Sequence, residues 1–551
     1  SDSSDRLLIL RPRRFGKTLM MSTLRHFLEI NRKRPGDTSE HEKLFKGLSV
    51  LDDREFTAEC MGQFPVVFFS FNGVDGKNFD SAMSNLSSSI FSLAEEFEWL
   101  MDSERLNSRQ KESLGNLLNE KLMRSKEAQS YVISSLTTLC SLLLTHYGRK
   151  PVFLIDEYDV PLQKASLRGY YQDMLDVIRP MLTKLLKNNS NVYKVIMTGC
   201  LRASKESIFT GMNNIEVNTV LSSRNRLAKA FGFTPDEVMK MLRYYGLENL
   251  YENARLWYDG YSIDGNDMFC PWDVTCYCMD VATPCMDSDP ALFEPPSYWN
   301  GSSSNDIIRE FLPYLRSDDS DMMEALIRGE SVQLRVSDSL SYGELNKHRP
   351  EHFWSILVYT GYLTKDRNGT KNSNVFRIPN AEIRSCFRDQ IAQYYDPQEK
   401  GVFANISEII ANELLEGRET NLRDSMNDTL AAFVSVRDSA VRAPRENYYH
   451  GFINGLLAPA ADSKTIRDYS SNRESGDGYP DVSFRGSESG TGTVIELKHV
   501  SDMNDLKKAS EDALSQIISK NYAERLFRDG LTEVMAWGIA FCGRHCNVSL
   551  R

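Results

Sequence analysis

Two short clusters of residues have the types and spacing needed for chemistry on phosphate groups. The first is Gly16-Lys17-Thr18, which lies between the apolar run Leu7–Leu10 and a helical pattern of apolar residues at 19–28. A strand, a loop and a helix in this order direct backbone N–H groups and the positive end of the helix dipole at phosphate. Lys17 would reach the β- and γ-phosphates of a nucleotide, and the Thr18 hydroxyl would bind Mg²⁺.

The loop departs from the usual phosphate-binding pattern at one position. That pattern begins with a glycine five residues before Gly16, where this chain has Arg11. A bare Gly-Lys-Ser/Thr triplet also arises by chance about once in a few chains of this length at ordinary residue usage. The loop by itself therefore leaves both nucleotide binding and a chance match open.

An acidic cluster follows a second apolar run, Val152–Ile155, which is typical of a strand buried on both faces. The sequence Asp-Glu-Tyr-Asp begins directly after it, at Asp156. An acid at the end of such a strand is suited to Mg²⁺, and a second acid can act as a general base toward water. We therefore expect Asp156 to be associated with Mg²⁺ and Glu157 to be the base. The alternative, a solvated acidic turn, fits one acid better than three acids in four positions.

A third apolar run, Tyr193–Met197, ends at Thr198, and Arg202 follows shortly after it. Thr198 is placed to sense the γ-phosphate, and Arg202 is placed to contact charge that develops there. The residues expected to bind the nucleotide are Arg13, Arg14, Phe15, Gly16, Lys17, Thr18, Thr198 and Arg202.

The second cluster lies near the C-terminus. Asp481 opens a strand pattern at 481–484, a loop rich in Gly and Ser follows at 485–493, and residues 494–498 read Val-Ile-Glu-Leu-Lys. Side chains alternate across a strand, so Glu496 and Lys498 share one face, and a hairpin can bring Asp481 beside them. Two carboxylates can hold Mg²⁺, and the lysine can orient or deprotonate a water for attack on a phosphodiester. Surface hairpins with such charges are frequent, so the spacing alone is a loose pattern.

Three longer motifs carry a more specific resemblance. They are R-P-R-R-F-G-K-T-L at 11–19, D-E-Y-D-x-P at 156–161 and T-G-x-x-R-x-x-K-E-S-I-F-x-G-x-N-N at 198–214. Together they resemble the AAA-ATPase-like family, which also lacks the first loop glycine, and further matches extend over nearly the whole chain. The resemblance implies an ATP-hydrolysing domain with ATP and Mg²⁺ as cofactors.

The C-terminal residues resemble a nuclease of the PD-(D/E)XK type, which often follows such an ATPase. This resemblance assigns as metal-binding acids Glu474, Asp481 and Glu496. It assigns as catalytic residues Asp481, Glu496, Lys498 and Gln516. Gln516 and Tyr522 resemble the helix-borne pair that steadies the site or the DNA in relatives, and the expected αβββαβ order matches the nuclease core. Oxygen ligands suit Mg²⁺ or Mn²⁺ at this second site.

The elements that position these residues predict an α/β chain of three domains, a natural number for 551 residues. We expect an AAA-like P-loop ATPase core with a parallel sheet at 1–223, and a helical lid with a winged-helix-like middle region at 224–400. A helical linker and a PD-(D/E)XK nuclease α/β domain are expected at 401–551. Leucines at helical spacing within 72–150 predict core helices. The expected aromatic packing anchors are Trp257, Trp272, Trp299 and Trp354.

Charge and composition limit the surroundings of the chain. The net charge of −11 argues against general attraction to nucleic acid. Residues 1–34 nevertheless carry nine Lys/Arg against three acids, an excess that suits a polyanion, although 32–34 is better interpreted as a solvated helix face. We find no apolar run long enough to cross a bilayer, and the scattered cysteines favour reduced thiols. The expectation is an intracellular, cytoplasmic protein without a membrane partner, or a nuclear one if it is a delivered effector.

Two functions remain open. The first is an ATP-hydrolysing protein whose metal-dependent nuclease cleaves nucleic acid, expected to be DNA, under control of the ATPase. The second is an ATP-driven regulatory or effector switch whose C-terminal fold binds nucleic acid or partners with little cleavage. In a variant of either, the pair is the effector end of a secreted crinkler-like toxin, which the architecture resembles. Intact Asp481, Glu496 and Lys498 favour the first function. A homo-oligomer is also open, and the candidate arginine fingers are Arg13, Arg14 and Arg202.

Overall fold

The computed structural model divides into two compact units. The first contains Ser1–Pro295 with Gln333–Asn380, and the second contains Pro296–Val332 with Ala381–Arg551. The residues described are 5–187, 189–201, 215–222, 225–282, 295–299, 322–323, 325–327, 329–337, 340, 349–366, 374–387, 402–433, 445–462, 465–471, 475, 478–487 and 490–551. The predicted domain limits at residues 223 and 400 stay predictions.

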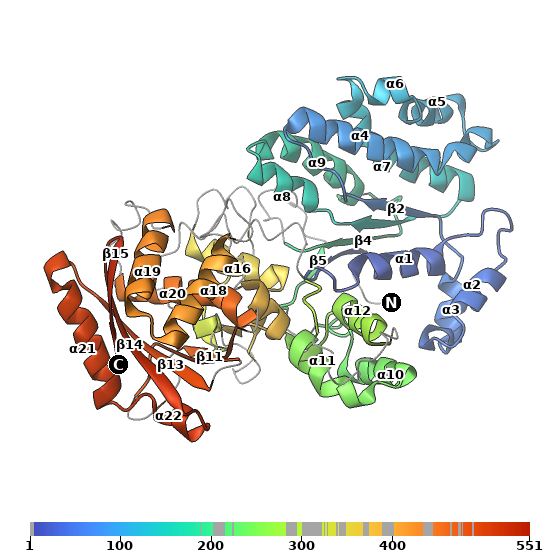
Figure 1. The fold of residues 1–551 in the computed structure, drawn as a ribbon. Coiled ribbons are helices and arrows are strands. Elements are labelled where there is room, and N and C mark those ends of the chain that lie inside the picture. Colours follow the sequence, from blue (N-terminus) through green and yellow to red (C-terminus); the bar gives the residue numbers. More distant parts are fainter. Residues whose placement is uncertain are drawn as a thin grey trace. The chain divides into compact units, whose positions relative to one another are not determined.

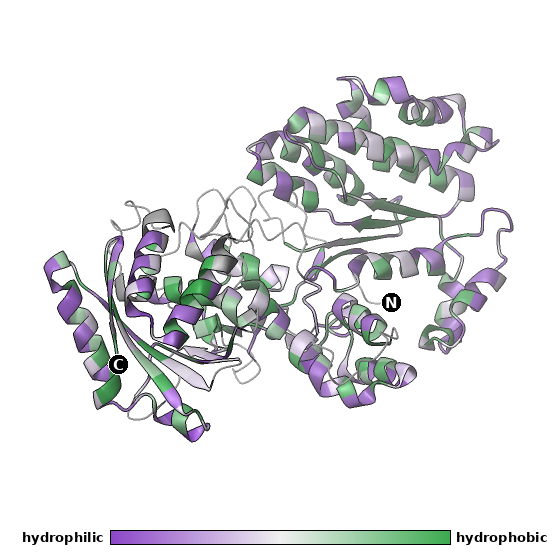
Figure 2. Ribbon diagram, viewed as in Figure 1, coloured by the Kyte–Doolittle hydropathy of each residue, from purple (hydrophilic) through white to green (hydrophobic). Residues whose placement is uncertain are grey.

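A parallel sheet of five strands forms the centre of the first unit (Figure 1). In sheet order the strands are β2 (Val66–Ser70), β3 (Val152–Asp156), β4 (Lys194–Gly199), β1 (Arg6–Leu10) and β5 (Glu216–Asn218). Figure 2 shows the long strands hydrophobic along their length, as expected of parallel strands buried on both faces. The predicted parallel sheet is thus confirmed. Its order places β4 between β1 and β3, so three strand ends with polar residues meet at one edge.

Helices cover both faces of this sheet. Helix α1 lies on one face, and α4, α7, α8 and α9 lie on the other (Figure 1). The bounds are α1 (Lys17–Leu28), α2 (Ser39–Leu44), η1 (Ser49–Leu51), α3 (Arg54–Cys60), α4 (Phe79–Glu95), η2 (Glu98–Asp102), α5 (Ser108–Leu117), α6 (Glu120–Met123), α7 (Ala128–Tyr147), α8 (Val160–Leu167) and α9 (Tyr171–Leu186). The predicted core leucines of this region are buried, with Leu86, Leu136 and Leu139 fully so.

Helix α7 is the one described helix that is long and apolar enough to cross a membrane, judged by length and composition. This finding corrects the expectation that the chain has no such run. The helix packs against α4, α5 and α9, and Val132, Leu139 and Leu143 on it are buried. The apolar side chains of α7 therefore pack between helices of the first unit.

The rest of the first unit is mainly helical. Its elements are α10 (Pro235–Tyr245), η3 (Glu248–Leu250), α11 (Tyr251–Tyr258), β6 (Tyr261–Ile263), β7 (Asn266–Met268), α12 (Pro271–Ala282), β8 (Val332–Gln333), α16 (Pro350–Thr360), β9 (Thr364–Lys365) and β10 (Val375–Arg377). Strands β8, β10 and β9 form a small three-stranded sheet. The prediction of a packing anchor is wrong for Trp272, which is 55% exposed because it projects from the first turn of α12.

The second unit is built on a mixed sheet of order β11-β12-β13-β14-β15, in which β13 and β14 are parallel. Its elements are α18 (Val402–Glu416), α19 (Glu419–Phe433), α20 (Arg445–Asp462), β11 (Ile466–Ser471), β12 (Val482–Gly486), β13 (Thr491–His499), η7 (Met503–Asp505), α21 (Leu506–Ser519), α22 (Glu524–Arg528), β14 (Glu533–Cys542) and β15 (His545–Leu550). One face packs on α18, α19 and α20, and the other packs on α21 and α22. The expected αβββαβ order is present, followed by β15, a strand that the sequence patterns did not predict.

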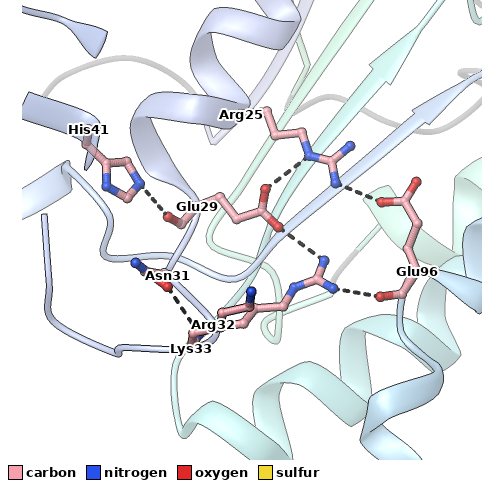
Figure 3. A network of polar contacts seen from close by, with 7 residues as sticks. All are labelled: Arg25, Glu29, Asn31, Arg32, Lys33, His41 and Glu96. Atoms are coloured by element: carbon pink, nitrogen blue, oxygen red, sulfur yellow. Dashed lines mark hydrogen bonds and ion pairs between the residues drawn. The ribbon is translucent and has the colours of Figure 1, made fainter. Parts of the chain in front are cut away.

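Two of the nine basic residues at 1–34, Arg25 and Arg32, form a network of polar contacts inside the first unit (Figure 3). Glu29 pairs with Arg25 at 3.1 Å and with Arg32 at 3.3 Å. Arg25 also pairs with the Glu96 carboxylate at 2.7 Å, and Arg32 donates to the Glu96 carbonyl oxygen at 2.8 Å. The network joins the C-terminal end of α1 to the segment after α4, so these two arginines are engaged by acids of the chain itself.

Candidate functional sites

The loop between β1 and α1 folds around the side chain of Lys17. Gly16 has a φ of 74°, a left-handed conformation that glycine adopts without strain, and α1 begins at the next residue. The Nζ of Lys17 donates to the carbonyl oxygens of Arg11 at 3.0 Å and Pro12 at 2.8 Å. Lys17 is buried, with 7% of the residue exposed, at the positive end of α1, where anionic groups are favoured.

Asp156 joins the loop helix to the neighbouring strand ends. Its Oδ2 accepts a hydrogen bond from the Thr18 hydroxyl at 2.6 Å, and its Oδ1 accepts one from the Thr198 hydroxyl. Asp156 is 1% exposed. A carboxylate and a hydroxyl are hard oxygen donors of the kind that Mg²⁺ prefers, so the donor set here fits this ion. The structure therefore brings Lys17, Thr18, Asp156 and Thr198 together.

Glu157 is set apart from its neighbour by an unusual backbone conformation. Its φ is 52°, which is uncommon for a residue with a Cβ atom. Burial raises the pKa of Glu157, the nearby charge of Asp156 raises it further, and Lys17 acts in the opposite direction. A carboxylate with a raised pKa beside a phosphate-binding loop is suited to take a proton from water.

The second half of the Asp-Glu-Tyr-Asp sequence has a structural role that the sequence reasoning missed. The Asp159 carboxylate accepts hydrogen bonds from the backbone N–H groups of Cys200 at 3.0 Å and Leu201 at 2.9 Å. The Tyr158 hydroxyl donates to the Leu201 carbonyl oxygen at 2.7 Å. A Cβ atom at position 199 would lie 2.6 Å from the Asp159 carboxylate, which explains why Gly199 stands there. Of the three acids in this sequence, Asp159 therefore has a structural role, because it holds the chain after β4.

Three predicted nucleotide residues contact other parts of the first unit. Arg13 donates to the Gln163 side chain at 3.4 Å. Arg14 approaches Asp273 of α12 at 3.8 Å, and the Phe15 ring packs edge-on against Tyr261 with centroids 4.8 Å apart. Their contacts with a nucleotide stay predictions. Arg202 lies outside the described residues, and so does Glu474 of the second cluster.

Arg11, which replaces the usual first glycine, is a fully buried residue that the sequence reasoning did not place. Its guanidinium donates to the Leu10 carbonyl oxygen at 2.9 Å, the Asn218 side chain at 2.8 Å and the Leu227 carbonyl oxygen at 3.0 Å. Burial lowers the pKa of Arg11 to about 10. The group lies 5.5 Å above the Phe231 ring. Arg11 thus joins the loop to the segment after β5. The sequence signal for this structural role is an arginine at the position where the usual phosphate-binding pattern has its first glycine.

The second cluster is built on the β12–β13 hairpin, in which Val482 pairs with Ile495. Ile495 and Leu497 belong to the core shared with α18, α19 and α20, whereas Val494 belongs to the core shared with α21 and α22. Glu496 and Lys498 alternate with the former pair, so they lie on the α21 face. The strands extend further into the expected loop than predicted, because Arg485 pairs with Gly492.

Two further side chains converge on this hairpin. The Asp481 Oδ2 accepts a hydrogen bond from the backbone N–H of Leu497 at 2.7 Å. The Glu496 Oε1 accepts one from the Gln516 Nε2 on α21, and Glu496 is 7% exposed. Asp481, Glu496, Lys498 and Gln516 are therefore brought to one region. Carboxylate oxygens suit Mg²⁺ or Mn²⁺, although within the described part of the chain no three His, Cys, Asp or Glu side chains form a metal-binding group.

Tyr522 secures the chain before Asp481. Its carbonyl oxygen accepts a hydrogen bond from the Ser475 hydroxyl at 2.6 Å. A Cβ atom at position 478 would lie 3.0 Å from the Tyr522 ring, so the ring packs closely on Gly478. Of the predicted helix-borne pair, Gln516 lies on α21, whereas Tyr522 lies in a turn beyond the end of that helix at Ser519. Gln516 contacts a carboxylate, and Tyr522 holds the backbone next to the position of Glu474.

The first sheet and its loop define a P-loop nucleotide-binding domain, and the second sheet with its carboxylates defines a nuclease-like α/β domain. The comparisons with known families agree with both. Residues 1–209 match the sequence model described as "Predicted AAA-ATPase", and residues 444–550 match that of the PD-(D/E)XK nuclease superfamily. The chain therefore carries an AAA-ATPase-like domain followed by a PD-(D/E)XK nuclease superfamily domain.

One curated relative resembles most of the chain. It is described as "Uncharacterized protein in vnfD 5'region" of Azotobacter chroococcum mcd 1, and it is 23% identical over 409 residues. The alignment covers 72% of this chain and 65% of the relative, so the chain matches slightly less than two thirds of that protein's length.

Proposed function

We propose that this protein hydrolyses ATP at the first site and cleaves nucleic acid, with DNA as the substrate, at the second. ATP binding and hydrolysis govern the cleavage. The observation that carries the proposal is the second site, where Glu496 bonds to Gln516 and lies on the strand face that also bears Lys498. A hairpin that served only as a scaffold would have no need of a buried carboxylate held by a helix-borne amide.

At the first site, Mg²⁺ bound with ATP would neutralise charge on the phosphates. Thr18 and Asp156 are the residues that would hold the ion. Lys17 binds the β- and γ-phosphates when its Nζ exchanges the loop carbonyl oxygens for phosphate oxygens. Glu157 accepts the proton of the attacking water, which its raised pKa favours.

At the second site, a divalent cation would polarise the scissile phosphodiester. Asp481 and Glu496 are the residues that would hold it, together with Glu474 if that residue completes the set. Gln516 keeps Glu496 oriented through its amide N–H. Lys498 orients a water molecule and, as its neutral amine, takes a proton from the water while the water oxygen bonds to phosphorus. The phosphorus–oxygen bond to the departing sugar oxygen breaks in this step, and that oxygen is protonated by bulk water.

Binding of nucleic acid must rely on local charge, because the chain as a whole carries −11. Helix α21 and the residue after it supply exposed Lys507, Lys508 and Lys520 in the same unit as the second site. Attraction between such a patch and a phosphate backbone depends on the release of counterions. We therefore expect the affinity for DNA to fall steeply as salt is added.

The test is cleavage of plasmid DNA, single-stranded DNA and RNA by the wild type, Lys17→Ala and Lys498→Ala. Each protein is assayed with Mg²⁺ or Mn²⁺, with and without ATP. The proposal requires cleavage that disappears in Lys498→Ala and changes with ATP in the wild type but not in Lys17→Ala. ATP hydrolysis without cutting of any substrate would instead support an ATP-driven switch with a non-cleaving nuclease fold.

A further inference from the structure

A pair of adjacent residues on α20, Tyr449 and His450, reaches both strands that carry the second site. Helix α20 packs on the face of the sheet opposite α21, so neither side chain lies among the carboxylates themselves. Both are nevertheless more than nine-tenths buried, at 3% and 5% exposure. Two buried polar aromatic groups need hydrogen-bond partners, and the identity of those partners is informative.

His450 binds the two ends of the segment that leads to the metal-binding acids. Its Nε2 lies 3.0 Å from the backbone carbonyl oxygen of Asp481 and 3.0 Å from the hydroxyl of Ser471. A carbonyl oxygen can only accept, so Nε2 carries a hydrogen and donates it to Asp481. Ser471 is the last residue of β11, and Asp481 directly precedes β12. The imidazole therefore joins the end of β11 to the start of β12.

Tyr449 reaches the other side of the hairpin. Its ring stacks on Phe541 with centroids 4.4 Å apart and on His499, the residue after Lys498, with centroids 5.8 Å apart. Its hydroxyl donates to the Gly543 carbonyl oxygen at 2.6 Å. The end of β13 and the end of β14 are thus held by one ring. As a result, the two neighbouring residues of α20 set the positions of the Asp481 turn and of the strand end that carries Lys498.

We propose that His450 is a positioning residue of the nuclease centre, which sets the Asp481 carboxylate for divalent-metal binding by holding the Asp481 carbonyl oxygen. This inference rests on the proposed function. The Asp481 carboxylate accepts a hydrogen bond at Oδ2 from the backbone N–H of Leu497, and its main-chain carbonyl oxygen accepts one from His450, so one contact on the side chain and one on the main chain define its place. Loss of the imidazole donor frees the main chain and leaves only the first contact. Groups that orient metal ligands typically change metal affinity by about 10- to 100-fold when removed.

The experiment measures Mn²⁺ binding to the full chain by calorimetry, in the absence of ATP, and counts only the binding that Glu496→Ala abolishes. The variants are His450→Leu, which lacks the donor, and His450→Gln, whose amide N–H can take the place of Nε2. We expect the Mn²⁺ affinity of His450→Leu to fall about 10-fold and that of His450→Gln to stay within about 3-fold of the wild type. Cleavage by His450→Leu should be restored in part by excess Mn²⁺, which a general loss of folding would not allow.

Asn427→Ala is the matched control. Asn427 also bridges a helix to a strand through backbone contacts, since its side chain accepts from the Cys546 N–H at 2.8 Å and donates to the Cys546 carbonyl oxygen at 3.2 Å. Its strand is β15, at the far edge of the sheet from β11. We expect Asn427→Ala to lower the melting temperature without changing the Mn²⁺ affinity.

The outcomes separate this inference from the proposed function. A wild type that binds Mn²⁺ through Glu496 but cuts nothing removes the nuclease activity and leaves the His450 comparison valid. Equal Mn²⁺ affinity in His450→Leu and the wild type overturns the positioning role, whatever the cleavage result. An equal loss in His450→Leu, His450→Gln and Asn427→Ala also overturns it, because the effect would then follow stability and not the donor. Absence of Mn²⁺ binding in the wild type overturns both.

Discussion

The two candidate sites differ in how far apart in the sequence their contacting residues lie. At the first site, Asp156 is bonded to Thr18 across 138 positions and to Thr198 across 42. At the second site, Asp481 contacts Leu497 across 16 positions and Glu496 contacts Gln516 across 20. One site is assembled by the crossover connections of a parallel sheet, and the other by one hairpin and the helix that follows it.

This difference in sequence separation has a physical consequence for how substitutions disrupt each site. A parallel sheet has long connections, so the first site exists only when several distant segments have folded together. The hairpin site depends mainly on local pairing and on the helices that cover it. Substitutions that break chemistry in one unit should therefore leave the other unit's binding intact, whereas substitutions of buried links should act through folding.

The largest expected effect tests the second site, whose residues are close in sequence. Lys498→Ala should lower the rate of DNA cleavage about 10³-fold, because the group that takes the proton from water is lost. ATP hydrolysis by the same protein should stay near the wild-type rate, and both rates are measured on one preparation. Arg418→Ala is the control, since it removes an exposed cation of the same unit that lies between α18 and α19, on the helices that cover the face of the sheet opposite α21. Equal losses in both variants would contradict the assignment.

The next effect tests Glu157, the base expected at the first site. Glu157→Gln should slow ATP hydrolysis about 10²- to 10³-fold while retaining ATP binding, because proton acceptance is lost but the loop is kept. Fluorescent-nucleotide titration and phosphate release measure the two quantities. Loss of ATP affinity in parallel with the rate would show a binding role instead.

The raised pKa of Glu157 adds a dependence on pH. The base must be ionised, so the hydrolysis rate should begin to fall on acidification at a pH above the ordinary range of a glutamate. The folded state binds this proton more readily than the unfolded state, so Glu157 lowers stability as the pH rises through its folded pKa. Glu157→Gln should therefore melt at a higher temperature than the wild type at pH 8. A wild-type rate that is flat down to the ordinary glutamate range would contradict this.

A smaller effect tests the buried link between loop and sheet edge. Arg11→Met should destabilise the first unit by about 2 to 4 kcal/mol, because the Asn218 side chain and the Leu227 carbonyl oxygen lose a charged donor in a buried place. Calorimetry of the full chain measures it, with the transition of the first unit identified by its shift on adding Mg²⁺-ATP. Arg11→Lys, which keeps the charge but not the fork of donors, should lie in between. A change in the second unit's transition alone would contradict this view.

The smallest effect concerns the exposed network of Figure 3. Arg32→Ala should lower stability by less than about 1 kcal/mol, because its ion pair with Glu29 is partly solvated and ordering two long side chains is costly. The same calorimetric transition measures it, at low and high salt. A loss as large as that of Arg11→Met would mean that the contacts of Arg32 with the Phe97 and Trp99 rings contribute more than the charges do.

Much of the fold could be predicted from the sequence because its strongest signals are local. The apolar runs at 7–10, 152–155 and 193–197 contain most of the residues of β1, β3 and β4. Strand β15 was not predicted, although Cys546, Val548 and Leu550 alternate with polar residues as in a half-buried strand. The exposure of Trp272 could not be predicted, because a helical pattern does not indicate which side of the first turn of α12 packs against the rest of the protein.

The sequence by itself determined the identity of the chemical groups and the class of each domain. Gly16-Lys17-Thr18 and the alternation of Glu496 with Lys498 depend on local backbone geometry, which a few neighbouring residues set. Only the tertiary structure decided that Asp156 receives both threonine hydroxyls while Asp159 holds the chain after β4. It also decided that Arg11 is buried and that His450 binds the main chain of Asp481. The physical reason is that burial and hydrogen-bond partnership depend on strand order and on helices packed from far along the chain.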